Sequence, residues 1–341
     1  MKTLVTGGAG FIGSHLVKKL VEGKRKVIIV DDLSSGSVEN LLTLGIKRSD
    51  FELRKIDLTD YHETLKALKD GENIFHLAAR IGGIKYLHET EDAELLAMQT
   101  NLAIDANVFK ACNINKIKKI VYSSSVAVYS LEKQFSLGVV FSEKDFSARP
   151  KTQDSSLKFQ MSVNPDGGYG WAKLIGEIHL NWMRNVAKIG IARIFNIYGQ
   201  NEPIGEKAHA ISDLIKKALF YPKEDFIVWG NGNQTRDYLY VSDCVDALIK
   251  LEEKINNLQG SPLILNIGSG RAASIREITE KIIEISGKNI KPIYDSSKPV
   301  GPVSRTANIN KAKDLLGWQP KINREEGLKI TYSWIKEKLT K

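Results

Sequence analysis

The stretch that decides the fold is VTGGAGFIGSHL, residues 5–16, near the start of the chain. Glycines stand at positions 7, 10 and 13, directly after a short apolar run and before a segment with helical periodicity. One such glycine permits a tight turn, one lets backbone N–H groups approach a pyrophosphate, and one lets the helix pack against the sheet. A glycine triplet between a strand and a helix therefore predicts a dinucleotide-binding unit.

Outward from this stretch, strand and helix patterns alternate along the chain. This alternation predicts an α/β fold with a Rossmann-type doubly wound parallel sheet and a smaller interleaved α/β lobe. We expect the dinucleotide-binding domain at 1–195 plus about 233–268, and the smaller lobe at about 196–232 plus 269–341. Ser242 and Ser274 are the expected N-caps of their helices. The predicted strands are 2–6, 27–30, 51–56, 74–77, 119–123, 190–195, 226–229 and 263–267, and the predicted helices are 13–22, 92–111, 170–187, 208–219, 242–251, 274–286, 309–316 and 325–339.

Composition excludes several other classes. No apolar run in the 341 residues approaches the ~18 needed to span a bilayer, and the N-terminus lacks the pattern of a signal peptide, so we expect a cytoplasmic protein without a membrane partner. Cys112 and Cys244 give no disulfide or metal spacing, and we expect both to be structural and no metal to be bound. The net charge of +9 comes mostly from dispersed lysines. It indicates no nucleic-acid stripe, although it favours a diphosphate ligand.

Acidic residues follow two of the predicted strands. Asp31 ends the second strand, where a carboxylate accepts hydrogen bonds from an adenosine ribose and repels a 2′-phosphate. No arginine follows immediately, which favours NAD over NADP. Asp57, with Leu58, follows the third strand, where it would either meet the adenine or cap a helix.

Hydroxyls and a Tyr/Lys pair indicate redox chemistry. Ser123, Ser124 and Ser125 end the fifth strand, and ligands bind beyond the carboxyl ends of such strands. Tyr169 and Lys173 are four residues apart and share one helix face. A phenol is a poor base at neutral pH, but a nearby ammonium together with a positive nicotinamide would lower its pKa toward the working range.

These motifs, in this order, resemble those of the extended short-chain dehydrogenases/reductases, and more narrowly the nucleotide-sugar epimerases and dehydratases. The resemblance covers essentially the whole chain. Residues 78–84, 206–209 and 327–337 are most similar to GDP-sugar members such as GDP-mannose 3,5-epimerase and GDP-fucose synthase. The motifs are TGGAGFIG (6–13), HLAA (76–79), SSS-x-x-VY (123–129), YxxxK (169–173), RIFNIYG (193–199), QTRDY (234–238) and LLGWQP (315–320).

The resemblance implies a role for each matching residue. Tyr169 would take the proton of the sugar 4-hydroxyl, Lys173 would hold the nicotinamide ribose, and Ser125 would hydrogen-bond the same hydroxyl. Arg236 and Arg305 would grip the nucleotide diphosphate, and Asn196 would meet the diphosphate region. The implied NAD-binding residues are Gly7, Gly10, Phe11, Ile12, Gly13, Asp31, Asp57, Leu58, Leu77, Ala78, Ala79, Tyr169 and Lys173.

Two residues depart from the family pattern. Val126 and Ala127 stand where 4,6-dehydratases of the family have Asp and Glu, which disfavours dehydration. Ala127 also replaces the catalytic Cys of the 3,5-epimerase and the GDP-fucose synthase. Lys207 or His209 matches the Lys or His relay of those enzymes, and the alternative is a surface lysine and a half-buried histidine.

The sequence thus predicts an NAD-dependent enzyme that oxidises a nucleotide sugar at C4, most simply a 4-epimerase, with a GDP-sugar favoured over a UDP-sugar. A C4 dehydrogenase, a 4-keto reductase, a 3,5-epimerase using Lys207 or His209, and an NAD-binding sensor or scaffold remain alternatives. Residues 151–164 form an insertion that is either a lid or a surface loop. By resemblance we expect a homodimer that pairs through the helices at 92–111 and 170–187.

Overall fold

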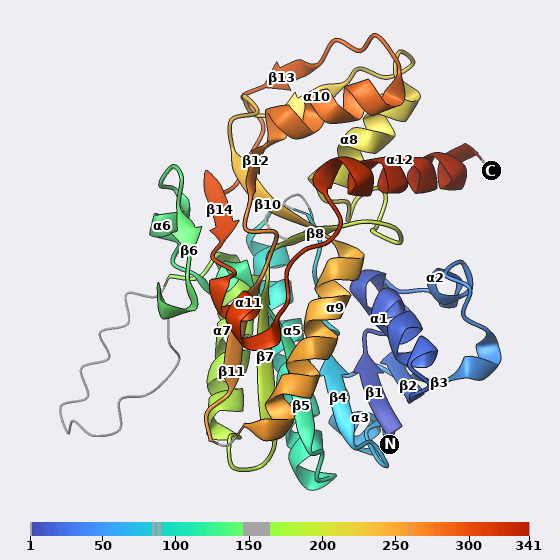
Figure 1. Cartoon of the computed structure of the whole chain (residues 1–341), viewed down its shortest axis with the longest axis vertical. Coiled ribbons are helices and arrows are strands. Elements are labelled where there is room, and N and C mark those ends of the chain that lie inside the picture. Colours follow the sequence, from blue (N-terminus) through green and yellow to red (C-terminus); the bar gives the residue numbers. More distant parts are fainter. Residues whose placement is uncertain (1, 84–85, 87–89, 146–163, 259, 341) are drawn as a thin grey trace, which may run out of the picture.

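The computed structural model describes residues 2–83, 86, 90–145, 164–258 and 260–340. Within them, seven parallel strands form the main sheet in the order β11-β7-β5-β4-β1-β2-β3 (Figure 1). The strand order reverses beside β1, which opens a crevice at the carboxyl ends of the strands. The predicted doubly wound sheet is confirmed. The strands are Lys2–Thr6 (β1), Lys26–Asp31 (β2), Phe51–Lys55 (β3), Asn73–His76 (β4), Lys119–Ser125 (β5), Lys188–Ile194 (β7) and Leu263–Ile267 (β11).

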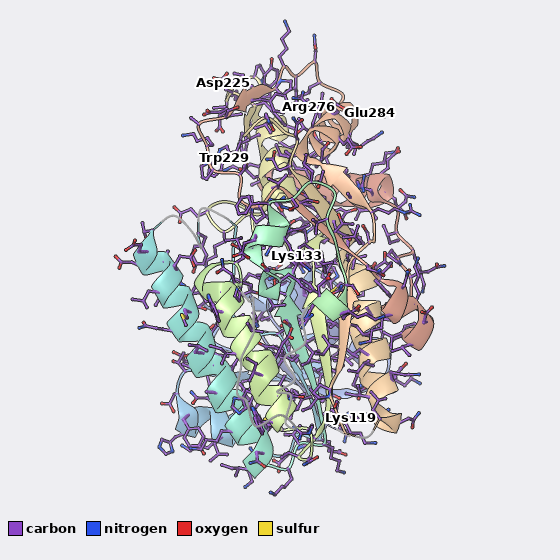
Figure 2. The ribbon with its side chains drawn as sticks, turned by 90° about the vertical axis from the view of Figure 1, so that its left-hand side faces the viewer. Lys119, Lys133, Asp225, Trp229, Arg276 and Glu284 are labelled. Carbon is purple, nitrogen blue, oxygen red and sulfur yellow. The ribbon has the colours of Figure 1, made fainter. Side chains whose placement is uncertain are left out.

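Helices cover both faces of this sheet because successive strand residues are buried on opposite sides. Leu4 belongs to the core under α3, α5 and α7, whereas Val5 belongs to the core under α1 and α9. In Figure 2, α5 and α7 lie side by side on one flank of the sheet. These helices are Phe11–Glu22 (α1), Tyr61–Ala67 (α3), Glu91–Ile114 (α5), Gly167–Trp182 (α7) and Val241–Lys254 (α9).

The smaller lobe stands above the carboxyl edge of the main sheet (Figure 1). In its main sheet, β12, β10, β14 and β6 are neighbours in that order, and β8 also pairs with β10. A separate pair, β9 and β13, lies beside α8 and α10 at the far end. The elements of this lobe are Val140–Phe141 (β6), Asn196–Tyr198 (β8), Ile227–Trp229 (β9), Thr235–Tyr240 (β10), Ala272–Ser274 (β12), Ile293–Asp295 (β13), Ser304–Ala307 (β14), Leu131–Gln134 (α6), Ala210–Phe220 (α8), Ile275–Ser286 (α10) and Arg324–Thr340 (α12). Two further helices belong with the main sheet: Val38–Leu42 (α2) packs on α1, and Asn310–Leu316 (α11) packs on α9 and β11.

Helix boundaries confirm one predicted cap and correct another. Ser274 caps α10 through a capping box, in which its hydroxyl accepts from the N–H of Glu277 at 3.1 Å. Ser242 is not an N-cap, because α9 continues directly from β10 and already begins at Val241. The helix predicted at 170–187 ends at Trp182. The prediction was too long because apolar residues continue at Met183 and Val186, which lie in the turn that follows. Among the described helices, none is long and apolar enough to cross a membrane.

Candidate active site

A cavity of about 1900 Å³ lies between the carboxyl edge of the main sheet and the smaller lobe. Lys173 is buried and does not line this cavity. The insertion predicted at 151–164 lies, apart from Asn164, outside the described residues. The other residues predicted to bind cofactor or substrate all line the cavity: Gly7, Gly10, Phe11, Ile12, Gly13, Asp31, Asp57, Leu58, Leu77, Ala78, Ala79, Ser125, Tyr169, Asn196, Lys207, His209, Arg236 and Arg305.

The glycine loop forms a cradle without room for side chains. Gly7 has a φ of +67°, and a Cβ there would lie 2.8 Å from the backbone nitrogen of Ala78. Gly10 is the N-cap of α1, so the first N–H groups of this helix face the cavity. A Cβ on Gly13 would lie 2.0 Å from the carbonyl oxygen of Gly7, so the third glycine lets α1 pack closely on the segment that leaves β1.

Asp31 joins the cradle to the second strand. Its two carboxylate oxygens accept from the N–H groups of Ala9 and Leu33, each at 2.9 Å. Burial raises the pKa of Asp31, and these two hydrogen bonds lower it. Asp57 accepts from the N–H of Thr59 at 2.8 Å, whereas the N-cap of α3 is Asp60. Asp57 therefore fixes a turn at the cavity wall and is not the helix cap.

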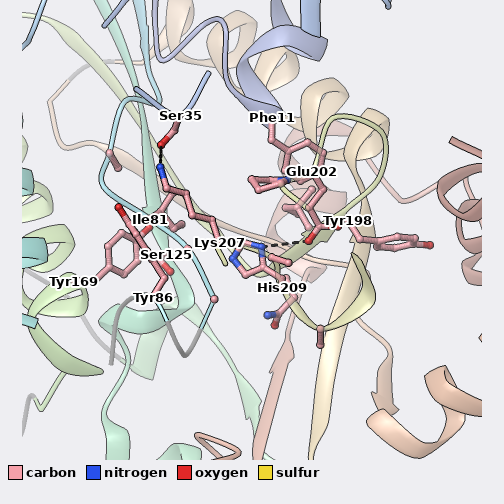
Figure 3. A pocket seen from close by; sticks show the side chains of 18 of the residues that line it. Phe11, Ser35, Ile81, Tyr86, Ser125, Tyr169, Tyr198, Glu202, Lys207 and His209 are labelled. Carbon is pink, nitrogen blue, oxygen red and sulfur yellow. Dashed lines mark hydrogen bonds and ion pairs between the residues drawn. The ribbon is translucent and has the colours of Figure 1, made fainter. Parts of the chain in front are cut away.

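The three serines at the end of β5 point to three different partners. Ser123 donates to the carbonyl of His76 at 3.0 Å, and Ser124 donates to the buried carboxylate of Glu177 at 2.5 Å. Ser125 accepts from the N–H of Ala127 at 3.2 Å, and its hydroxyl faces Tyr169 across the cavity wall and lowers the pKa of that phenol (Figure 3). Of the three serines, Ser125 is the one whose hydroxyl is placed beside Tyr169.

Lys173 lies behind Tyr169 on the next turn of α7. Its Nζ is 5.9 Å from the ring centroid of Tyr169 and 4.6 Å from that of Tyr122. Burial raises the pKa of Tyr169, and the hydrogen bond with Ser125 lowers it. The protein's own groups therefore do not lower the pKa of Tyr169 as the sequence predicts, because the effect of desolvating the phenol is larger than theirs. The prediction also includes the positive charge of a bound nicotinamide.

Arg236 and Arg305 lie opposite each other on β10 and β14. Arg305 pairs with Asp166 and donates to Gln134 at 2.5 Å. Arg236 is buried, and among the described residues it donates to the carbonyls of Thr235 at 2.8 Å and Val300 at 3.0 Å. Burial, and then the charge of Arg305, lower the pKa of Arg236 to about 10. Two adjacent guanidinium groups at a cavity wall suit a ligand with two phosphates.

Lys207 and His209 reach the cavity from the segment before α8 (Figure 3). Lys207 donates to the hydroxyl of Ser35 at 2.6 Å and lies 5.3 Å from the ring centroid of Tyr86. His209 contacts the buried carboxylate of Glu202 at 3.2 Å. Among the described residues, no hydrogen bond or ion pair joins either side chain to Tyr169, whereas Tyr86 packs in the same apolar cluster as Tyr169 and Ala127.

Sequence reasoning missed Tyr86 and Arg80 as cavity residues. The guanidinium of Arg80 lies 4.7 Å from the ring centroid of Tyr86, so this ring meets two cations. The sequence contains a signal for both residues: Arg80 lies within, and Tyr86 just after, the stretch 78–84 that resembles the GDP-sugar members. In the part of the chain that the structure describes, no group of His, Cys, Asp or Glu is arranged to hold a metal ion.

A glycine cradle at a helix N-terminus, beside a Ser, a Tyr and a Lys at the carboxyl edge of a Rossmann sheet, is the arrangement of the extended short-chain dehydrogenase/reductase class. The model of the NAD dependent epimerase/dehydratase family matches residues 3–268. The chain belongs to this family.

Individual relatives resemble the chain over nearly its whole length. A UDP-glucose 4-epimerase of Mycolicibacterium smegmatis is 32% identical over 344 residues, covering 99% of both chains. A GDP-mannose 3,5-epimerase of Arabidopsis thaliana is 31% identical over 350 residues, covering 100% of this chain and 84% of the relative. The crystal structure of the UDP-glucose 4-epimerase of Thermotoga maritima with UDP-glucose has a TM-score of 0.82 at 29% identity, covering 99% of this chain and 100% of that one.

The residues of the cavity fit NAD, the cofactor of the family. The cradle at Gly7 leaves backbone N–H groups within reach of a pyrophosphate. Asp31 lines the cavity where an adenosine ribose would lie. The buried Nζ of Lys173 lacks a hydrogen-bond partner among the described residues, which suits it to a ribose hydroxyl.

Proposed function

We propose that the protein is an NAD-dependent nucleotide-sugar 4-epimerase. The observation that carries the proposal is that Ser125 and Tyr169 lie together at the cavity, beside two apolar neighbours (Figure 3). Val126 and Ala127 are each 4% exposed and carry no group that can move a proton. Chemistry that needs only a base at the 4-hydroxyl is therefore favoured over dehydration or inversion at C3 and C5.

In this proposal the chain moves one proton and holds the sugar. Tyr169 removes the proton of the sugar 4-hydroxyl, and Ser125 donates a hydrogen bond that holds this hydroxyl. Bound NAD would supply a hydride acceptor at C4 and would return that hydride to the other face of the ring, while Tyr169 would give the proton back to the 4-oxygen. Arg236 and Arg305 hold the diphosphate, while Asn196, whose Oδ1 is buried without a hydrogen-bond partner in the described chain, faces the same region.

For the nucleotide we propose a GDP-sugar, on the resemblance of residues 78–84, 206–209 and 327–337 to GDP-sugar members. A UDP-sugar is the alternative, because relatives named as UDP-glucose 4-epimerases are equally similar in sequence. We also propose a homodimer. The large apolar side chains exposed on α5 and α7 favour it: Leu95, Leu96 and Ile114 on α5, and Trp171, Ile175 and Trp182 on α7.

The test is to incubate the protein and NAD with a panel of UDP- and GDP-sugars and to follow products by NMR. Interconversion of a C4 epimer pair supports the proposal, provided that Tyr169→Phe abolishes it. Accumulation of a 4-keto sugar would instead show a C4 dehydrogenase. Tight NAD binding without turnover of any sugar would favour the sensor.

A 3,5-epimerase is the second candidate, because Lys207 lies against Tyr86, and Tyr86 packs with Tyr169 and Ala127. Lys207 would then donate a proton to the sugar ring carbons. The two candidates differ in heavy water. A 4-epimerase returns the same hydrogen to C4 and incorporates no deuterium on carbon, whereas a 3,5-epimerase incorporates it at C3 and C5.

A further inference from the structure

A buried polar network lies directly behind the Tyr169–Lys173 pair. Asp105, in the middle of α5, accepts from the hydroxyl of Tyr122 at 2.5 Å, and its other oxygen is 3.0 Å from Nε2 of His76. All three side chains are almost completely buried. None of them lines the cavity, and the side chain of Lys173 lies between Tyr122 of this network and Tyr169, so we expect the network to act through Lys173.

The hydrogen bonds of this network all point toward Asp105. The N–H groups of Leu77 and Ala78 donate to the hydroxyl oxygen of Thr6 at 3.1 and 3.2 Å. Thr6 therefore gives its proton to Nδ1 of His76 at 2.7 Å, which leaves Nε2 of His76 as the donor to Asp105. Both carboxylate oxygens are thus acceptors, and Asp105 is a buried anion beside a neutral histidine.

Lys173 is the cation that balances this anion. Gly176, one turn further along α7, lets the helix approach, since a Cβ there would lie 2.7 Å from a carboxylate oxygen of Asp105. The ammonium of Lys173 rests over the ring of Tyr122, which itself donates to Asp105. Taking an ammonium group out of water costs several kcal/mol, so a fully buried lysine without a counter-charge has a lowered pKa and loses its proton readily.

We propose that Asp105 is a positioning residue that keeps Lys173 in its ammonium form and thereby sets the alkaline limit of catalysis. The proposal rests on the proposed function only for the role of Lys173 beside Tyr169. Burial lowers the pKa of Lys173, and the charge of Asp105 raises it. Burial likewise lowers the pKa of His76, which keeps it neutral.

Other charged groups near Asp105 do not replace it. Glu177 is fully buried but is neutralised by Arg193, whose two nitrogens donate at 2.9 and 2.7 Å. Burial lowers the pKa of His179 on α7, and the charge of Asp105 raises it, so His179 also responds to Asp105 and does not replace its charge. The titratable and charged groups around the network are Lys173, Tyr169, Glu177 and His179 from α7, His76 from β4, Tyr122 from β5 and Arg193 from β7.

The test compares Asp105→Asn with wild type in the NAD-loaded full-length protein. Lysine labelled with carbon-13 at Cε reports the titration of each ammonium by NMR, and Lys173→Met identifies the signal. We expect the Lys173 signal and the alkaline limb of kcat to move together to lower pH. Each pH unit of that movement gives about a tenfold loss of kcat on the alkaline side.

Glu252→Gln is the matched control. Glu252 is a buried carboxylate paired with Lys119 at 2.7 Å and Arg25 at 3.1 Å, and none of the three lines the cavity. This variant should lower stability without moving the alkaline limb or the Lys173 signal. If Asp105→Asn does not fold, Asp105→Thr removes the same charge while keeping a hydroxyl for His76 and Tyr122.

An unchanged Lys173 titration in either Asp105 variant would overturn the proposal. The NMR titration contains no nucleotide sugar, so it separates this proposal from the proposed function. A Lys173 signal that moves in a protein without epimerase activity would support the role of Asp105 and reject the 4-epimerase.

Discussion

Replacement of Arg193 by Met should mainly lower the free energy of unfolding, whereas replacement of Arg236 by Met should mainly weaken the binding of a nucleotide diphosphate. Arg193 is fully buried and pairs through two nitrogens with the equally buried Glu177. Arg236 is also buried, yet no carboxylate lies within ion-pair distance of it in residues that the structure describes, and its cross-strand neighbour is Arg305. We therefore expect Arg193 to stabilise the fold and Arg236 to serve a bound anion.

The magnitudes follow from these surroundings. The lowering of the pKa of Arg236 to about 10 corresponds to about 3 kcal/mol against its charged form. Arg236→Met removes this cost and loses two hydrogen bonds to carbonyls, worth about 2 kcal/mol together. The free energy of unfolding without ligand should then change by about 1 kcal/mol or less. Arg193→Met leaves Glu177 buried and unpaired, which should cost about 3–5 kcal/mol.

Urea unfolding of both variants without ligand measures these changes in stability. Calorimetric titration with UDP and GDP measures how strongly each variant binds a nucleotide diphosphate. Loss of charge-assisted bonds worth about 3 kcal/mol should weaken nucleotide-diphosphate binding to Arg236→Met by about 100-fold. If Arg236→Met loses as much stability as Arg193→Met and still binds the nucleotide normally, the reasoning is refuted and Arg236 is a structural residue.

Three further predictions are simpler. Tyr169→Phe should lower kcat by about 10²–10⁴-fold in a protein that still folds and still binds NAD in a fluorescence titration; equal activity would exclude Tyr169 as the base. Burial lowers the pKa of His15 to about 4, so the unfolded chain takes up a proton below pH 6.5 that the folded chain refuses. Stability should therefore fall between pH 7 and 5, and urea unfolding should show His15→Asn losing about 2 kcal/mol less than wild type. In urea unfolding, Ser274→Ala should lower the free energy of unfolding by about 1 kcal/mol, because Ser274 caps α10. Ser242→Ala should leave it unchanged, because Ser242 does not cap a helix.

Sequence patterns predicted those parts of the fold that depend on local spacing. The glycine loop follows a strand and opens a helix, and Ser274 has its Glu partner three residues later, so both could be recognised without tertiary contacts. Strand β10 was missed, because its alternating polar and aromatic residues, TRDYLY, gain burial only between β12, β14 and β8. The wrong cap at Ser242 has the same origin, since β10 leads into α9 without a loop.

The site divides in the same way. The cofactor loop and the Tyr169–Lys173 pair lie in short motifs, whereas Asp105 looks like an ordinary polar residue of a helix. Its partners His76 and Tyr122 are distant in sequence and come from two strands, so its burial depends on long-range packing. The partners of Lys207 and His209, Ser35 and Glu202, likewise follow only from the way the loops meet at the cavity.

The most direct test of the central claim is a nucleotide sugar that carries deuterium at C4, turned over in ordinary water and examined by NMR. The account predicts that the deuterium is found at C4 of the epimerised product and that Tyr169→Phe prevents its transfer. Deuterium lost to the solvent, or epimerisation that proceeds without Tyr169, would contradict it.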